Sequence, residues 1–357
     1  MKTIRWGMIG CGEVAQTKSG PALYHAGSSQ LVAVADRNAA RAEDFARRHG
    51  IARWHDEAEA IIRAPDVDVV YVATMTESHR DLVLRCAAAG KPVLTEKPMA
   101  MTYADCLAMI AACREARVPL WVAYYRRALP RFLKVRELVQ GGAIGEVRLV
   151  IMRHFQRIPT PEEMRGGFWG WRLDPARSGG GIFFEAVAHT LDILDFTLGP
   201  IESARAFADN QAGAYPPEDI VTGAFRFASG AHGSGAWCFS ADCDEEGNEI
   251  VGSGGRIRFS TFPPLGPPAG RPPVPIRLLR GDAVEEFPVA DPPYVHQPLV
   301  QTIVDEMNGQ GCCPSTGETA ARTARVIDDC LAGFSARRRG EAGATAPRMP
   351  KPRASYP

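Results

Sequence analysis

The sequence predicts an α/β protein in which a doubly wound parallel sheet is followed by an α+β C-terminal domain with an open, mostly antiparallel sheet. In the first 123 residues, short apolar runs alternate with helical patterns, which is typical of a parallel sheet covered on both faces. From residue 144 onward, short strand patterns are separated by Gly, Asp and Asn, which favours antiparallel pairing. The length of 357 residues fits two domains of roughly 150 residues each.

The first domain is predicted to span residues 1–123. Apolar and β-branched residues are concentrated in five expected strands, at residues 4–9, 31–35, 67–74, 92–95 and 118–124. Helical patterns between these strands begin near Glu13 and cover residues 39–49, 79–89 and 103–116. Gly90 would end the helix at 79–89, because glycine is the preferred residue just after a helix.

The second domain is predicted to span residues 124–335. Its strands are expected at residues 144–155, 201–208, 220–227, 231–239, 249–251 and 256–260. Its helices are expected at residues 182–198, 299–308 and 316–334, and the last of them is a candidate for packing back on the first domain. The proline-rich segment 263–275 is predicted to be an irregular loop, and the basic, proline-rich tail 336–357 to be disordered.

The charge balance and the cysteines narrow the function classes. With 41 basic and 41 acidic residues, the chain has no electrostatic signature of a nucleic-acid-binding or membrane-surface protein. No apolar run approaches the ~20 residues of a membrane span, and the N-terminus has the pattern of a strand, not of a signal peptide. The nine cysteines include no C-x-x-C pair, which favours a reducing, cytoplasmic compartment.

A glycine motif follows the first strand directly. Residues 10–15, Gly-Cys-Gly-Glu-Val-Ala, fit G-x-G-x-x-G/A and open a helix. In this motif Gly10 makes the turn, Gly12 lets the backbone approach a pyrophosphate, and the helix N-terminus adds partial positive charge. Asp36 ends the second strand 24 residues after Gly12, where a carboxylate binds ribose hydroxyls and favours NAD over NADP. Arg37 keeps NADP possible, because an arginine there can meet a 2′-phosphate.

Two further polar segments follow strands of the predicted parallel sheet. Residues 74–79, from Thr74 to His79, come after one strand, and Glu96-Lys97-Pro98 comes after the next. Ligands of open parallel sheets bind beyond the carboxyl ends of the strands, so Lys97 is predicted to face the cofactor crevice. The alternative is a solvated surface lysine, which is what most lysines are.

The segment 182–198 is apolar almost all round and is predicted to be a buried helix. At 100° per residue, its polar residues Glu185, His189 and Asp192 point within about 60° of one another. Such a stripe faces a polar network, a metal or a substrate. A core histidine hydrogen-bonded to Glu185 is one alternative. A metal site is disfavoured, because it needs three or four ligands and the helix offers two.

These motifs occur in the order found in the Gfo/Idh/MocA family of NAD(P)-dependent oxidoreductases, which the chain resembles from Ile4 to Phe334. The resemblance implies a Rossmann N-domain, a C-domain whose sheet supports a homodimer or homotetramer, and chemistry on sugars, polyols or related hydroxy compounds. It also implies that Lys97 lies beside the reacting oxygen of the substrate and that His189 exchanges the proton. Glu185 stands where the family commonly has aspartate, and the resemblance implies that it is the third catalytic residue, able to reach an oxygen or to orient the imidazole.

The resemblance extends to the rest of the site. The residues expected near the cofactor are Gly10, Gly12, Glu13, Val14, Ala15, Asp36, Arg37, Thr74, His79, Glu96, Lys97, Trp171 and Arg172. Those expected near the substrate are Tyr124, Arg126 and Asp192. A dihydrodiol or non-sugar carbonyl reductase, which would have an aromatic pocket, is the alternative enzyme, and a non-catalytic member that senses cofactor or ligand is the alternative outside catalysis.

Overall fold

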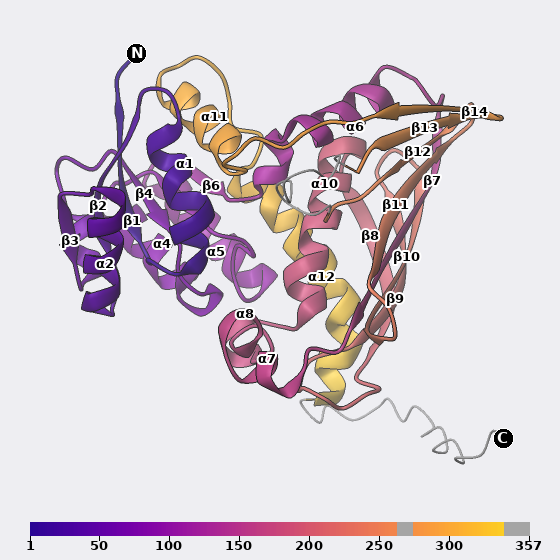
Figure 1. Cartoon of the computed structure of the whole chain (residues 1–357), viewed down its shortest axis with the longest axis horizontal. Helices are drawn as coiled ribbons and strands as arrows, with labels where there is room; N and C mark the ends of the chain where they lie inside the picture. Colours follow the sequence, from indigo (N-terminus) through magenta and orange to yellow (C-terminus); the bar gives the residue numbers. More distant parts are fainter. Residues whose placement is uncertain (263–273, 339–357) are drawn as a thin grey trace.

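The computed structural model describes residues 1–262 and 274–338, and these residues fold around two sheets with helices between them (Figure 1). Most of the predicted proline-rich loop, and the predicted tail from residue 339, lie outside the described residues. Residues 336–338 belong to the last helix. Within the described ranges, no helix combines the length and the apolar character needed to cross a lipid bilayer.

The first sheet is parallel and confirms the predicted fold class of the N-terminal part. Its order is β3-β2-β1-β4-β5-β6, which is the strand order of dinucleotide-binding sheets and places the ligand crevice where the order reverses, between β1 and β4. The strands are β1 (Ile4–Ile9), β2 (Ser29–Ala35), β3 (Arg53–His55), β4 (Val69–Val72), β5 (Val93–Thr95) and β6 (Leu120–Val122). All five pairings are parallel.

Helices cover both faces of this parallel sheet. They are α1 (Gly20–His25), α2 (Ala39–His49), α3 (Ala58–Ile62), α4 (His79–Ala88) and α5 (Tyr103–Glu115). Side chains of Asn38 and Thr102 cap α2 and α5 by accepting a backbone hydrogen bond in the first turn. Gly90 follows α4 with a φ of +68°, so the predicted helix end is confirmed. β3 and α3, of three and five residues, carry too short a pattern to be predicted.

The second sheet is mixed and mostly antiparallel, as predicted. Its order is β14-β13-β12-β11-β7-β10-β9-β8, and only the β7–β10 pairing is parallel among the described strands. The strands are β7 (Val147–Arg157), β8 (Ile201–Asp209), β9 (Ile220–Phe227), β10 (His232–Ala241), β11 (Glu245–Gly252), β12 (Arg256–Phe259), β13 (Ile276–Arg280) and β14 (Ala283–Phe287). Large apolar side chains of the open face are exposed, with Phe207 84% and Ile151 41% accessible.

The remaining helices connect the two sheets. They are α6 (Pro130–Gln140), α7 (Pro161–Arg165), α8 (Gly167–Gly170), α9 (Pro175–Ser178), α10 (Ala188–Leu198), α11 (Gln297–Met307) and α12 (Gly317–Arg338). α11 packs against α1, where Gly27 N donates to Gln301 Oε1 at 2.7 Å. α12 contacts both β8 of the mixed sheet and α5 beside the parallel sheet (Figure 1). α12 therefore joins the mixed sheet to the helices and strands of the parallel sheet.

Candidate active site

A cleft of about 1540 Å³ runs between the two sheets. Pockets for drug-sized ligands measure roughly 300–1,000 Å³, so this cleft has room for a dinucleotide and a small substrate together. It is lined by most of the residues predicted from the sequence: Gly10, Gly12, Glu13, Val14, Ala15, Asp36, Arg37, Thr74, Glu96, Lys97, Arg126, Trp171, Arg172, Glu185 and His189. Three predicted residues, His79, Tyr124 and Asp192, are not among the lining residues.

The glycine turn after β1 has the shape that a pyrophosphate requires. Gly10 has a φ of +103°, and a Cβ on it would lie 2.6 Å from the Ala73 carbonyl oxygen, so only glycine fits. A Cβ on Gly12 would meet no atom within 4 Å, which leaves open space above the turn. The helix begins at the next residue, with its free N–H groups directed at this space. These residues fit a dinucleotide cofactor.

Asp36 holds the glycine turn and marks the far end of the cleft. Its Oδ2 accepts a hydrogen bond from Cys11 N at 2.9 Å, and its Oδ1 accepts one from Asn38 N at 2.9 Å. The carboxylate keeps further lone pairs for ribose hydroxyls. Arg41, in the first turn of α2, lies 3.6 Å from Asp36 Oδ2 and also lines the cleft. Sequence reasoning missed Arg41 because nothing in the motif marks its position.

Lys97 leaves β5 and reaches across the cleft to the helix that carries the other predicted catalytic residues. Its Nζ lies 2.9 Å from Glu185 Oε2 and donates to the Glu185 carbonyl oxygen at 3.4 Å. The two side chains are 16% and 6% exposed, so Lys97 is not a solvated surface lysine. Arg172 Nε lies 3.7 Å from the same Oε2, so two cations share one buried carboxylate.

Glu96 fixes the backbone on which Lys97 is mounted. Tyr71 donates to its Oε1 at 2.5 Å, Lys97 N donates to its Oε2 at 3.0 Å, and His296 Nε2 lies 3.5 Å from its Oε1. Burial by itself would raise the pKa of Glu96, but His296, Tyr71 and the charge on Lys97 outweigh it and lower the pKa to about 2. Glu96 is therefore a carboxylate that positions Lys97.

His189 is the second residue of α10 and is 6% exposed. The rings of Tyr124, Tyr125 and Phe262 lie edge-on to it, with centroids 6.0, 5.8 and 5.9 Å away. Neither ring nitrogen has a hydrogen-bond partner among the described residues, and Nδ1 is fully buried. Because Glu185 does not bond to it, His189 is not the satisfied core histidine of the alternative hypothesis.

The environment of His189 sets its protonation state. Burial, and then the positive charges of Arg126 and Lys97, hold the pKa of His189 well below 6.5. The imidazole is therefore neutral at pH 7 and can accept a proton from a hydroxyl group.

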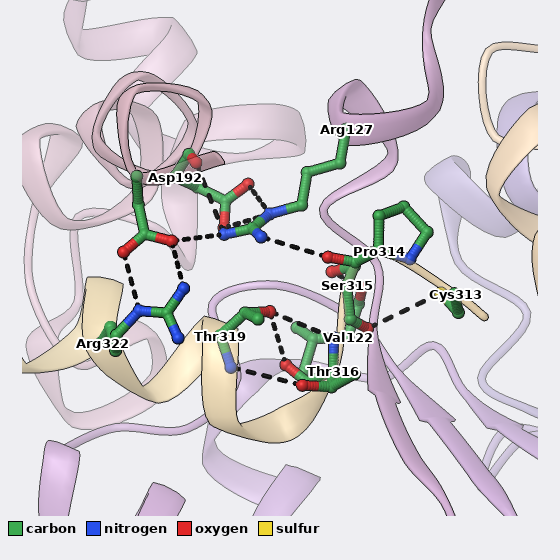
Figure 2. Close-up of polar contacts among 10 residues, drawn as sticks. Val122, Arg127, Asp192, Cys313, Pro314, Ser315, Thr316, Thr319 and Arg322 are labelled. Atoms are coloured by element: carbon green, nitrogen blue, oxygen red, sulfur yellow. Dashed lines mark hydrogen bonds and ion pairs between the residues drawn. The ribbon is translucent and has the colours of Figure 1, made fainter. Parts of the chain in front are cut away.

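Asp192 does not face the substrate, contrary to the prediction. Its carboxylate is 1% exposed and is bound by Arg127, with Nε 2.9 Å from Oδ2 and Nη2 2.8 Å from Oδ1 (Figure 2). The same guanidinium also reaches Asp195 Oδ1 at 3.1 Å, and Arg322 pairs with Asp195 from α12. The prediction assumed the 100° per residue of an α-helix. Phe183–Val187 is π-helical, which changes the angle between the Glu185 and Asp192 side chains around the helix axis.

Two other predicted residues stand behind the cleft. His79 is 1% exposed, and its ring nitrogens lie 3.0 Å from Pro98 O and 3.1 Å from Thr74 O. It therefore ties the loop after β4 to the loop after β5 and does not reach a cofactor. Tyr124 is 2% exposed, and its ring supports His189 from behind. His79 and Tyr124 both belong to segments that form the cleft, which is why they were predicted to line it. Their side chains point into the protein interior instead.

The cleft also contains residues that no motif indicated: Lys18, His154, Gln156, Phe262 and His296. His296 precedes α11 and stacks on Tyr125 with a centroid distance of 4.2 Å. Phe262 follows β12, more than seventy residues after His189, whose ring it contacts. Such residues meet only through tertiary packing, so sequence spacing carries no signal for them.

Comparisons with known proteins agree with this geometry. A family model described as "Oxidoreductase family, NAD-binding Rossmann fold" matches residues 4–124, and one described as "GFO/IDH/MocA C-terminal domain" matches residues 132–258. "Oxidoreductase P35" of Formosa agariphila is 33% identical over 332 residues, which cover 91% of this chain and 97% of the relative. "1,5-anhydro-D-fructose reductase" of Ensifer adhaerens is 31% identical, with 88% of this chain and 91% of the relative covered.

Among solved structures, aldose-aldose oxidoreductase from Caulobacter crescentus complexed with glycerol is similar, with a TM-score of 0.79 and 27% identity. The match covers 95% of this chain and 98% of that one. The first family model covers the parallel sheet with Lys97, and the second covers the segment with His189. The chain belongs to the Gfo/Idh/MocA family and is an NAD(P)-dependent dehydrogenase or reductase that acts on CH–OH groups.

Proposed function

We propose that this enzyme transfers a hydride between a nicotinamide cofactor and a hydroxyl or carbonyl carbon, with His189 as the acid/base and Lys97 as the stabiliser of the oxygen. The observation that supports this most strongly is that both side chains line one cleft with the glycine turn, although Lys97 follows β5 of the parallel sheet and His189 lies on α10. Lys97 contacts Glu185, four residues before His189 on the same helical segment, so the ammonium and the imidazole approach the same space.

The residues divide the chemistry between them. The bound nicotinamide supplies the hydride acceptor or donor. In the oxidising direction, neutral His189 takes the hydroxyl proton as negative charge develops on the oxygen. The Lys97 ammonium, which is 16% exposed, donates to that oxygen from a largely buried position, where such a contact stabilises charge more strongly than in water. Glu185 and Glu96 hold Lys97 in place.

A substrate panel followed by nicotinamide absorbance tests this proposal. The relatives named above support sugars, anhydro sugars and polyols as the first compounds to assay. A trans-dihydrodiol belongs in the panel because Phe168, Trp169, Trp171 and Phe262 give part of the cleft an aromatic lining. A mouse relative, 30% identical over 239 residues, is a trans-1,2-dihydrobenzene-1,2-diol dehydrogenase. Cofactor binding without turnover of any compound would contradict the catalytic proposal and favour a sensor.

We also propose that NAD(H) binds more tightly than NADP(H), because a 2′-phosphate would lie against the Asp36 carboxylate. We expect the Kd for NAD to be lower than that for NADP by about tenfold, and Asp36→Asn to remove most of the difference. The asparagine oxygen can still accept from Cys11 N, so the turn keeps its hydrogen bond. Calorimetry with both cofactors measures the ratio, and tighter binding of NADP by the wild type would contradict it.

We further propose a homodimer or homotetramer that covers the open face of the mixed sheet, where Phe207 is 84% exposed on β8. A charge at this position would be buried without a partner in such an interface. Phe207→Asp is therefore expected to lower the mass measured by light scattering, whereas Leu107→Asp, on the exposed side of α5, should not. A monomeric wild type, or an assembly unaffected by Phe207→Asp, would contradict this proposal.

A further inference from the structure

Arg126 is a buried cation without a carboxylate partner in the part of the chain that the structure describes. The residue is 3% exposed, Nε donates to Thr261 O at 3.0 Å, and Nη1 donates to Tyr125 Oη at 2.8 Å. No carboxylate oxygen of residues 1–262 or 274–338 lies within 4.0 Å of it, and its Nη2 makes no hydrogen bond to these residues. Arg126 nevertheless lines the cleft, so its free edge faces the space where ligands bind.

The neighbouring buried arginines are paired with carboxylates, as buried charges usually are. Arg127, the next residue, is bound by two carboxylates of α10. Arg131, one turn further on, lies 3.9 Å from Asp291. A buried charge is costly unless it is paired, and a bound anion would supply the partner that Arg126 lacks. The rings of Tyr125 and Phe262, each 4.9 Å from the Arg126 guanidinium, offset only part of this cost.

A second cation in the same cleft also lacks a partner. Lys18 is an exposed residue that lines the cleft and has neither a hydrogen bond nor an ion pair to any described residue. Lys97 and Arg172, by contrast, share the Glu185 carboxylate. The part of the cleft around His189 therefore offers two cations to a ligand, Arg126 and Lys18.

Resting on the proposed function, we infer that the substrate carries an anionic group, a carboxylate or a phosphate, that binds to Arg126 while its hydroxyl lies between Lys97 and His189. The Nη1–Nη2 edge of a guanidinium presents parallel donors that match two oxygens of such a group. Tyr125 and Phe262 contact both the Arg126 guanidinium and the His189 ring. The anion and the reacting hydroxyl therefore fit within one small molecule, such as a sugar acid or a sugar phosphate.

The position of Arg126 indicates that the anion it binds belongs to the substrate and not to the cofactor. Its anchors Thr261 and Phe262 follow β12 of the mixed sheet. The glycine turn and Asp36, which fit the pyrophosphate and the ribose, both belong to the parallel sheet. Arg126 thus stands on the substrate side of the cleft, and we expect its removal to act on the KM of the substrate.

Matched substrate sets test the inference without any mutation. A neutral sugar or polyol, the corresponding sugar acid and the corresponding phosphate are compared by kcat/KM with saturating cofactor. We expect at least one anionic member to exceed its neutral parent by a factor on the order of 100, the usual effect of a desolvated charged hydrogen bond. Preference for the acid identifies a carboxylate, and preference for the phosphate identifies a phosphate. Turnover of neutral compounds without any anion preference would overturn the inference while the proposed function stands.

Variants assign the preference to Arg126. Arg126→Gln is expected to raise KM for the preferred anion on the order of 100-fold more than KM for its neutral parent, and Arg126→Lys is expected to keep part of the preference. Arg131→Gln is the matched control, because it removes a neighbouring buried arginine that does not line the cleft. A preference that survives Arg126→Gln, or that Arg131→Gln abolishes equally, would overturn the inference.

A failure of the proposed function can be distinguished from a failure of the anion-site inference. If no compound is turned over, the proposed function fails, and the thermal shift given by each compound in the presence of NADH then decides the inference. Stabilisation by an anion but not by its neutral parent, lost in Arg126→Gln, would support an anion site. Equal shifts for both compounds would overturn it.

Discussion

Replacing Lys97 by methionine is expected to lower kcat for hydride transfer by about 10²–10³-fold, the loss typical of removing one donor to a developing oxyanion. The ammonium reaches the cleft only because β5 ends beside it and Glu185 holds it at 2.9 Å. Steady-state rates on a substrate identified by the panel measure the loss. Lys134→Met is the control, since Lys134 pairs with Glu137 on α6 and does not line the cleft.

A double variant separates direct action of Lys97 from a structural effect. In Lys97→Met alone, the buried Glu185 keeps only Arg172, 3.7 Å away, as a nearby cation. Adding Glu185→Gln removes that buried charge. If Lys97 acts on the substrate oxygen, the double variant stays as slow as Lys97→Met. Recovery of wild-type kcat in the double variant would show that Lys97 only neutralises Glu185.

Replacing Asp192 by alanine is expected to lower the free energy of unfolding by about 3–5 kcal/mol, because it leaves the guanidinium of Arg127 buried with one carboxylate fewer. This carboxylate joins α10 to Arg127, which also donates to Pro314 O at 3.1 Å, so the loss is felt between elements far apart in the sequence (Figure 2). Urea unfolding followed by circular dichroism measures the change.

The control for this experiment is an exposed ion pair. Asp81 pairs with Arg85 at 3.2 Å but is 72% exposed, so Asp81→Ala is expected to cost no more than about 1 kcal/mol. A loss below 1 kcal/mol for Asp192→Ala would contradict the structural role assigned to the buried network.

The parallel sheet was predictable because each of its strands and helices is marked by a pattern within its own short stretch of sequence. Each strand is a short apolar run, each helix has its own periodicity, and Gly10 and Gly90 mark a turn and a helix end by their conformation. β13 and β14 were not predicted, because charged residues on these outermost strands hide the strand pattern. The division at residue 123 stays a prediction, since α11 and α12 return to the parallel sheet.

The sequence could predict those site residues that directly follow a strand of the parallel sheet. Lys97 and Asp36 were placed correctly in the cleft because each follows the carboxyl end of a parallel strand. Asp192 was placed wrongly, because a π-helical turn cannot be read from residue spacing. Arg126 was expected near the substrate, but the sequence could not show that it lacks a carboxylate partner. That property depends on Thr261 and Phe262, which meet Arg126 only in the folded chain.

The pH dependence of kcat/KM for oxidation, in the wild type and in His189→Ala, tests the central claim most directly. A base must be neutral to act, and burial and nearby cations lower the pKa of His189 well below 6.5. The wild-type rate should therefore hold from neutral pH to well below pH 6.5 and fall only there, as the imidazole takes up its proton. His189→Ala should be slower by about 10²–10⁴-fold and lack this fall. Wild-type rates in His189→Ala, or an unchanged acid limb in that variant, would contradict the assignment of His189 as the proton acceptor.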